Sequence, residues 1–526
     1  MALYFMNSSR TVVIAAMMCL LGLCTTVLAM TSVEPGTPPP RQSDAIDVAA
    51  LARLYPQASD YLWLHNQQLT KQARQALAFI AGASRHGLDP DDYHADLLRQ
   101  LQPEQDESEA HLFDLVLSDG LLKLAHDMTQ GRLDPAIVDP KWSIPRQPFD
   151  AVTFLREALS GNNLNASLNS LVPDSRSYRQ LLNAAERYKR IVDDGGWIKI
   201  PATPLLRAGD AHENIAVIRQ RLLTEGYHVD LPRPSKRNIY DDQLRQAIQQ
   251  FQRQHSLYPD GIIGPATLHA LNVSASARLQ HIYINMERLR WLPDDLGRRY
   301  ILVNLANYRL QAIEENRVKL DMRVIVGKKK RSTPSFSSAI TDIVLNPRWY
   351  VPGKLARKDL LPKQQRNPDY FSRFSFRVFA YENGRRTEID PDSVDWQSLS
   401  ENNFPYTLVQ DPGNKNALGH LKFVMPNPWK IYLHDTPSKN LFKQSRRTFS
   451  SGCIRVEDPL ALADFSLDHT PDRPVTELIN SEEIYTTRLE QPLPVYAVYA
   501  TVWLDGDAIV FSPDSYGRDR RMLGYL

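Results

Sequence analysis

The stretch IYLHDT at 431–436, followed by SSGCIRV at 450–456, decides how the fold of this chain is interpreted. Apolar residues lead into His434, which predicts a strand that ends at the histidine. Gly452 allows a tight turn directly before Cys453, because glycine adopts backbone conformations that other residues avoid. The pattern therefore predicts a β-rich region in which a glycine-bearing turn presents a cysteine 19 positions after a histidine.

The cysteine count gives Cys453 further weight. The chain has three cysteines, and Cys19 and Cys24 fall inside an apolar N-terminal segment. Cys453 therefore has no partner for an intramolecular disulfide in the rest of the chain, and it is buried and inert, paired between chains, or a working thiol. A nucleophilic thiol needs a neighbouring base or cation to favour the thiolate, and His434 can provide it. Alone, His434 is more typical of a hydrogen-bonded histidine at a strand end.

The N-terminus has the features of an export segment. Arg10 precedes an apolar run at 11–29, and the run ends with a small residue at Ala29. We expect residues 1–30 to be a signal peptide or a membrane anchor, since the run is nearly long enough to span a bilayer. Residues 31–44 are proline-rich and are expected to form an extended linker. The chain is therefore predicted to be exported.

Length and charge set further limits. A chain of 526 residues is expected to form about three or four domains. Its 62 basic and 60 acidic residues give a formal net charge of +2. With no net field and no basic stripe, nucleic-acid binding is not expected.

Residues 45–200 show apolar side chains at helical spacing, which predicts a helical domain. An acidic cluster at 89–94, with His94 beside three aspartates, has the residue types of a metal site. Gly87 and Pro90 favour a solvated turn there instead. No metal site is therefore expected in this domain.

Residues 208–272 predict a compact three-helix module. A stripe of isoleucine and leucine at 215–223 ends at Gly226, as a helix with a C-terminal glycine does. The strings IRQRLL at 218–223 and AIQQFQRQHSL at 247–257, with DGIIGPATLHALN at 260–272, resemble the peptidoglycan-binding domain type 1 family. Alternatively, these residues only pack a small bundle.

From about Arg299 the pattern changes to strands. Strand-like runs occur at 300–304, 319–326, 340–345, 421–424, 430–433 and 495–504. The stretch 352–419 between them is too long for a plain loop, so we expect an inserted subdomain that caps a site. Residues 298–526 are thus predicted to form one β-rich domain with a capping insertion.

A histidine followed at a distance by Ser-x-Gly-Cys-Ile-Arg resembles the signature of the YkuD-type L,D-transpeptidase family. Three further stretches are similar to its larger members: RSTP at 331–334, NPRWYVP at 346–352 and NALG at 416–419. The expected fold is α+β and multidomain. It combines a helical scaffold domain, a three-helix peptidoglycan-binding domain and a YkuD-type catalytic domain with a capping insertion.

The resemblance implies that Cys453 is the nucleophile and His434 the general base and acid. It also implies that Gly452, together with the Cys453 amide, forms part of the oxyanion hole. Tyr432, two positions before the histidine, either helps the site with its hydroxyl or is a half-buried strand tyrosine. Arg455 either holds the turn or neutralises a substrate carboxylate.

The two serines of the signature and the residue after the histidine complete the expected site. Ser450 and Ser451 are expected to satisfy backbone groups of the turn. Asp435 stands where many smaller members of the family have glycine, so the resemblance does not predict what surrounds His434.

The implied reaction joins peptidoglycan stem peptides. Cys453 would attack the peptide bond before the terminal D-Ala of one stem, and a diamino acid of another stem would accept the acyl group. Neither metal nor other cofactor is expected. Alternatives are an L,D-carboxypeptidase, another cell-wall cysteine peptidase, or a non-catalytic wall-binding scaffold. A papain-like enzyme is disfavoured because it places the cysteine before the histidine.

The resemblance also bears on location and inhibition. The expected partners are peptidoglycan stem peptides and glycan, and a membrane only through an N-terminal anchor. The expected location is the periplasm, either free or anchored to the inner membrane. Sensitivity to carbapenems is implied as well.

Overall fold

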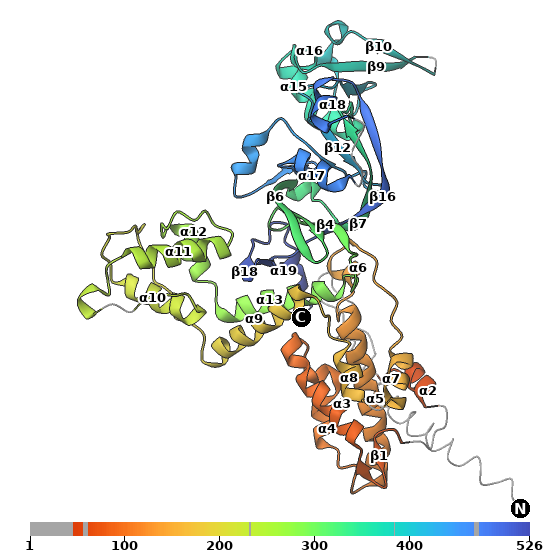
Figure 1. The fold of residues 1–526 in the computed structure, drawn as a ribbon, viewed down its shortest axis with the longest axis vertical. Helices are drawn as coiled ribbons and strands as arrows, with labels where there is room; N and C mark the ends of the chain where they lie inside the picture. Colours follow the sequence, from red (N-terminus) through yellow and green to blue (C-terminus); the bar gives the residue numbers. More distant parts are fainter. Residues whose placement is uncertain are drawn as a thin grey trace, which may run out of the picture.

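The structure, a computed structural model, describes residues 46–525 except 56–60, 162, 231–232, 383 and 468–472. A helical part lies at one end, a β-rich part at the other, and a smaller helical module to the side (Figure 1). The C-terminus lies near the centre, where these parts meet (Figure 1). The export segment and linker expected at 1–44 lie outside the described residues. No helix in the described ranges is long and apolar enough to cross a membrane.

The first helical part is built around α5 (Glu107–Gln130), whose middle turns are buried on nearly all sides. Asp106 begins α5 as an N-cap, because its carboxylate accepts from the amides of the first turn. Packed around α5 are α2 (Val48–Leu54), α3 (Lys71–Ala81), α4 (Ala95–Gln100), α7 (Ala151–Ser160), α8 (Leu164–Asn169) and the short hairpin β1 (Leu64–His65) and β2 (Gln68–Leu69). Helix α6 (Pro135–Val138) and strand β3 (Trp142–Ser143) follow α5 and lead toward the β-rich part.

Two further helices connect the parts. Helices α9 (Arg176–Asp193) and α13 (Ala275–Arg290) pack on each other and on the hairpin of β17 (Val502–Asp505) and β18 (Ala508–Phe511). Their shared core is separate from the core around α5. Helix α9 was expected within one helical domain at 45–200, and the hairpin within a β-rich domain. The structure instead gives both elements a common core with α13.

The side module consists of α10 (Asn214–Glu225), α11 (Asp242–Gln254) and α12 (Pro265–Leu271) around its own apolar core. Gly226 ends α10 in the left-handed conformation, with φ of 98°, as the sequence predicted. The module docks on α9 through buried polar groups. Arg221 forms an ion pair with Glu225 at 2.9 Å, and Tyr188 donates to the other oxygen of Glu225 at 2.6 Å.

The β-rich part is a sheet that closes on itself. The order is β12-β13-β15-β6-β5-β4-β16-β7, and β12 also pairs with β7, which leaves no open edge along the ring. The strands are β4 (Arg299–Asn304), β5 (Arg309–Glu314), β6 (Arg317–Gly327), β7 (Ser335–Leu345), β12 (Leu421–Val424), β13 (Leu433–His434), β15 (Ile454–Val456) and β16 (Tyr485–Val498). Strand β14 (Thr448–Ser450) pairs with β6, and helices α17 (Pro459–Ser466) and α18 (Val475–Asn480) follow β15. The apolar core fills the ring.

One strand of this sheet comes from the helical part. Strand β3 pairs in parallel with β7, at Trp142 with Ser335 and Ser143 with Phe336. The ring of Trp142 contacts that of Trp291, just after α13, with centroids 5.2 Å apart. The helical part therefore contributes a strand to the β-rich part.

The stretch expected as an insertion forms a subdomain with its own core. Its four-stranded sheet has the order β10-β9-β11-β8. The strands are β8 (Trp349–Tyr350), β9 (Phe376–Glu382), β10 (Arg385–Ile389) and β11 (Thr407–Gln410), and its main helices are α14 (Gly353–Leu355), α15 (Leu361–Arg366) and α16 (Tyr370–Arg373). A π-helical turn joins α14 to α15. The subdomain forms the far tip of the β-rich part (Figure 1).

Strand positions differ from the sequence expectation at several places. Strand β5 was not predicted. The expected strand at 430–433 begins later, because Lys430 has φ of 56° and breaks the extended conformation. The run expected at 495–504 is split between β16 and β17, since the backbone at Ala500 and Thr501 bonds to side chains, those of Asn304 and Asn285, instead of to a neighbouring strand.

Candidate active site

A groove of about 1310 Å³ lies between the closed sheet and the inserted subdomain. Cys453, His434 and Tyr432 line it, and so do residues of α14, α15 and α16. The lining includes twelve lysines and arginines and a single carboxylate, that of Asp359. The groove is therefore strongly cationic, a property that the net charge of the chain does not show.

Strand register explains which side chains meet in the groove. Strands β13 and β15 are parallel and pair Leu433 with Ile454 and His434 with Arg455. Extending this register by one residue places Tyr432 opposite Cys453, and the Ile454 amide donates to the Tyr432 carbonyl at 3.2 Å. Since side chains alternate along a strand, Tyr432, His434, Cys453 and Arg455 share one face. The histidine is thus diagonal to the cysteine, and the tyrosine faces it directly.

The thiol of Cys453 is half-buried. Burial raises its pKa, and hydrogen bonds from the Tyr432 amide and hydroxyl, with the charges of Lys422 and Arg455, act in the opposite direction. Its Sγ also lies 4.0 Å from the Lys430 carbonyl oxygen. The hydroxyl of Tyr432 is therefore directed at the sulfur of Cys453.

His434 is buried and held in one tautomer. Its Nδ1 lies 2.5 Å from the Asp435 carbonyl oxygen, which can only accept, so Nδ1 carries the proton. Burial lowers the pKa of His434 to about 3, with the charges of Arg455 and Lys422 adding to the effect. Among the described residues, no hydrogen bond joins His434 to Cys453. His434 is therefore neutral in the structure, so it is not the cation among the two alternatives, a base or a cation, that the sequence allowed beside the thiol.

Lys422 is the cation that sequence reasoning missed. It lies in β12 directly opposite His434, and its Nζ is 4.6 Å from the centre of the Tyr432 ring. Burial lowers its pKa, and the charge on Cys453 acts in the opposite direction. The available signal was one charged residue between the apolar Leu421 and Phe423, which points to a functional position in a strand.

The turn before Cys453 is held by side chains. Ser450 Oγ donates to the Cys453 carbonyl at 2.5 Å and accepts from the Gly452 amide at 3.1 Å. Gly452 has φ of 127°, a conformation that favours glycine. Because the Gly452 amide already donates to Ser450, the Cys453 amide remains as the candidate for the oxyanion hole. Ser450 thus bonds to two backbone groups of the turn, and Ser451 accepts from Arg331 at 3.0 Å.

Asp435 supports the loop that faces His434. Its Oδ2 accepts from the His420 amide at 2.9 Å, and its Oδ1 forms an ion pair with Lys439 at 2.6 Å. Gly419 has φ of 60°, and a side chain there would collide with the Asp435 carboxyl group. The carboxylate that replaces the expected glycine therefore anchors the segment before β12.

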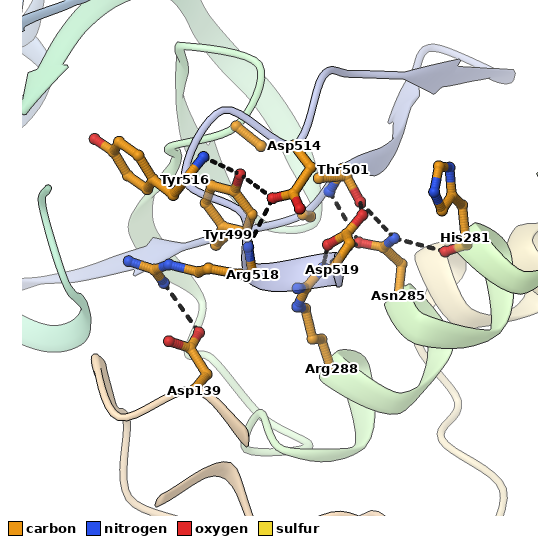
Figure 2. A network of polar contacts seen from close by, with 12 residues as sticks. Asp139, His281, Asn285, Arg288, Tyr499, Thr501, Asp514, Tyr516, Arg518 and Asp519 are labelled. Atoms are coloured by element: carbon orange, nitrogen blue, oxygen red, sulfur yellow. Dashed lines mark hydrogen bonds and ion pairs between the residues drawn. The ribbon is translucent and has the colours of Figure 1, made fainter. Parts of the chain in front are cut away.

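Behind the turn, buried polar contacts lead to the helical part. Thr333 Oγ1 donates to the Gly452 carbonyl at 2.8 Å. Arg518, in α19 (Arg518–Met522), donates to the Thr333 carbonyl at 2.8 Å and to Ser335 Oγ at 2.8 Å. The same guanidinium forms an ion pair with Asp139 at 3.0 Å, just after α6 (Figure 2). A continuous set of contacts thus links the helical part to the turn that carries Cys453.

Figure 2 shows how α19 is fixed at this junction. Asp519 forms an ion pair with Arg288 of α13 at 2.7 Å and accepts from Thr501 at 2.6 Å. Asp514 accepts from Tyr499 at 2.7 Å and from the Arg518 amide at 2.8 Å. Helix α19 therefore binds to α13 and to the segment after β16 at once.

The acidic cluster in the helical part has structural roles. Asp89 caps the short helix at Pro90–Tyr93, and Asp91 accepts from the Asp96 amide at 3.1 Å. His94 bonds to the buried Asp119 at 2.7 Å. In the described ranges no group of histidine, cysteine and carboxylate side chains is arranged to hold a metal.

Family models match three parts of the chain. Residues 49–184 match a scaffold domain, 211–271 a "Putative peptidoglycan binding domain", and 298–476 an L,D-transpeptidase catalytic domain. The chain carries a YkuD-type L,D-transpeptidase catalytic domain. The groove and both strands that position Cys453 and His434 lie within this YkuD domain. The multidomain α+β organisation expected from the sequence is confirmed.

A curated relative from Haemophilus influenzae, named "Putative L,D-transpeptidase", is 38% identical over 246 residues. The match covers 46% of this chain and 49% of the relative, so the chain spans about half the length of that relative. Two crystal structures of L,D-transpeptidases are also similar. That from Xylanimonas cellulosilytica is 14% identical, with a TM-score of 0.18 over 57% of this chain and 99% of its own. That from Stackebrandtia nassauensis is 11% identical, with a TM-score of 0.21, and the match covers 56% of this chain and 97% of the other. The assignment rests on the family models and the curated relative.

Proposed function

We propose that this protein is an L,D-transpeptidase that cross-links third-position diamino acid residues of peptidoglycan stems through a thioester on Cys453. The observation that carries the proposal is a half-buried thiol on a cationic groove, hydrogen-bonded by Tyr432 and diagonal to a neutral His434. A cationic groove suits stem peptides, which carry several carboxylates. The side module of α10, α11 and α12 is proposed to bind peptidoglycan, and the protein is proposed to act in the periplasm.

In the proposed first step, Sγ attacks the carbonyl before the terminal D-Ala of a tetrapeptide stem. The thiol proton passes to Nε2 of His434, because Nδ1 already donates to the Asp435 carbonyl. Such catalytic hydrogen bonds are often long in a free enzyme and shorten when substrate binds. The Cys453 amide would donate to the developing oxyanion. The C–N bond then breaks, His434 returns the proton to the leaving amine, and D-Ala departs.

In the second step, the side-chain amine of a neighbouring diamino acid attacks the thioester. His434 takes the proton of this amine and returns it to the departing sulfur, which restores the free enzyme. Water in place of the amine would give L,D-carboxypeptidase activity. Because the inserted subdomain lines the groove, it would limit access of water to the thioester.

Intact-mass measurement after incubation with a disaccharide-tetrapeptide tests the proposal. We expect the mass of one acyl group to be added, D-Ala to be released, and neither to occur with Cys453→Ala. D-Ala release by this variant would contradict the thioester mechanism. Stable acylation by a carbapenem is expected at the same residue, again absent in the variant. A non-catalytic wall-binding scaffold would show neither adduct.

A further inference from the structure

Two cations beside the thiol have no carboxylate partner. Within the described ranges neither Lys422 nor Arg455 forms an ion pair, and Arg455 Nε is buried without a hydrogen-bond partner. The single carboxylate of the groove, Asp359, is already paired with Arg331 and lies 3.9 Å from Lys328. Removing charges from water is costly unless an opposite charge compensates them. This arrangement is typical of a site that receives an anion.

Both cations lie on the face of the sheet that presents the nucleophile. Lys422 is opposite His434 on one side, in β12, and Arg455 is opposite His434 on the other side, in β15. Lys422 lies over the Tyr432 ring, whose hydroxyl bonds to the sulfur of Cys453. Because Lys422 contacts the Tyr432 ring and Cys453 bonds to the Tyr432 hydroxyl, an anionic group that binds Lys422 lies on the side of the thiol where this tyrosine stands.

The proposed reaction brings one particular anion to that place. The leaving group is the last residue of the stem, so its carboxylate is free, and consecutive Cα atoms are about 3.8 Å apart. That carboxylate thus lies one residue beyond the scissile carbonyl. A bond before an internal residue would instead place a neutral amide there.

We propose that Lys422 binds the free carboxylate of the leaving D-amino acid and thereby restricts cleavage to the last residue of the stem. This inference rests on the proposed function. Arg455 contributes a second positive charge at the same subsite. The Lys422 ammonium is suited to this role because, among the described residues, it donates no hydrogen bond and only its cation–π contact with Tyr432 holds it in place. After D-Ala departs, the subsite is free again.

Two synthetic donors test this role: a disaccharide-tetrapeptide ending in D-Ala, and the same molecule ending in D-alaninamide. The measured quantity is the ratio of kcat/KM for acylation of Cys453 by the acid and by the amide. For the unaltered protein we expect the acid to be favoured by about 10- to 100-fold, the usual effect of one hydrogen bond between charged groups. Lys422→Met should bring the ratio close to one, and Lys422→Arg should retain a preference for the acid.

Lys330→Met is the matched control, because Lys330 is exposed and lines the same groove. It should leave the ratio unchanged. Alkylation of Cys453 by the neutral reagent iodoacetamide confirms that each variant is folded with an accessible thiol. The dependence of the alkylation rate on pH also reports the pKa of the thiol.

The outcomes separate the possible roles. Equal loss with both donors in Lys422→Met, with a raised pKa of Cys453, would show that Lys422 only stabilises the thiolate and would overturn the inference. The absence of any preference in the unaltered protein would overturn it as well. If neither donor acylates the unaltered protein, the proposed function itself fails. Acylation with an unchanged ratio in Lys422→Met overturns only the carboxylate subsite.

Discussion

The ion pair between Asp139 and Arg518 provides a quantitative test of how the helical part supports the catalytic turn. Both side chains are almost fully buried, at 3% and 7% exposure. Removing one partner of a buried pair costs about 3–5 kcal/mol, because the other charge stays buried without compensation. In Asp139→Asn, Arg518 keeps its bonds to Ser335 and Thr333 and its contact with the Tyr499 ring at 4.6 Å. We therefore expect the lower end of that range, about 3 kcal/mol.

A double-mutant cycle with Arg518→Met isolates the pair. Each single change should destabilise the protein, and the double change should cost clearly less than their sum, by about 1–3 kcal/mol. Urea unfolding followed by tryptophan fluorescence is a suitable assay. Trp142 and Trp291 are in contact at this junction and report on its opening. At about 2–4 °C per kcal/mol, Asp139→Asn should also lower Tm by about 6–12 °C.

The same change should affect catalysis without touching the groove. Loss of the ion pair loosens Arg518, which holds the Thr333 carbonyl, while the Thr333 hydroxyl holds Gly452. We expect a lower kcat for acylation of Cys453 with KM nearly unchanged. Additive effects in the cycle, with coupling below about 0.5 kcal/mol, would refute the pair as a unit. An unchanged kcat in a destabilised variant would refute its link to the turn.

Three other predictions follow from the site. Tyr432→Phe removes the hydroxyl bonded to the sulfur, so the pKa of Cys453 should rise further and alkylation by iodoacetamide at pH 7 should slow about 10-fold; an unchanged rate would exclude this bond from thiol activation. The pKa of His434 is about 3 in the folded protein and about 6.5 in the unfolded protein, so the unfolded state binds the proton first as pH falls. The free energy of unfolding should therefore decrease between pH 6.5 and pH 3, by about 1.4 kcal/mol per pH unit for this residue. His434→Gln should reduce that slope in urea unfolding at several pH values, and an equal slope would argue against a buried neutral histidine. Gly419→Ala should destabilise the protein more than Gly297→Ala, because both have positive φ but only the first introduces a collision with a neighbouring carboxyl group; equal losses in Tm would show that backbone conformation alone matters.

The sequence predicted the local parts of the site well. A strand before His434, a glycine turn before Cys453 and a serine that bonds to the turn all follow from residues close together in the chain. The inserted subdomain could also be predicted, because a stretch of that length without its own structure is unusual in a compact domain. The three-helix module at 208–272 was predictable for a different reason: its helices and turns are continuous in sequence.

The sequence could not show contacts that depend on strand register. That Tyr432 faces the sulfur while His434 is diagonal to it depends on the pairing of β13 with β15. The position of Lys422 depends on β12, which pairs with both β13 and β7. Burial then determines charge, and for this reason His434 is neutral in the structure although an exposed histidine would titrate near pH 6.5.

The strand that the helical part contributes to the catalytic sheet has a consequence for dissection of the protein. A fragment that begins near residue 298 would lack β3 and Asp139. Its sheet would expose the unpaired edge at Ser335 and Phe336, and Arg518 would remain buried without its counterion. Such a fragment would be prone to aggregation at that edge, so the smallest piece that folds independently should include the helical part. Domain boundaries drawn from family models are therefore unsuitable as cutting points in this chain.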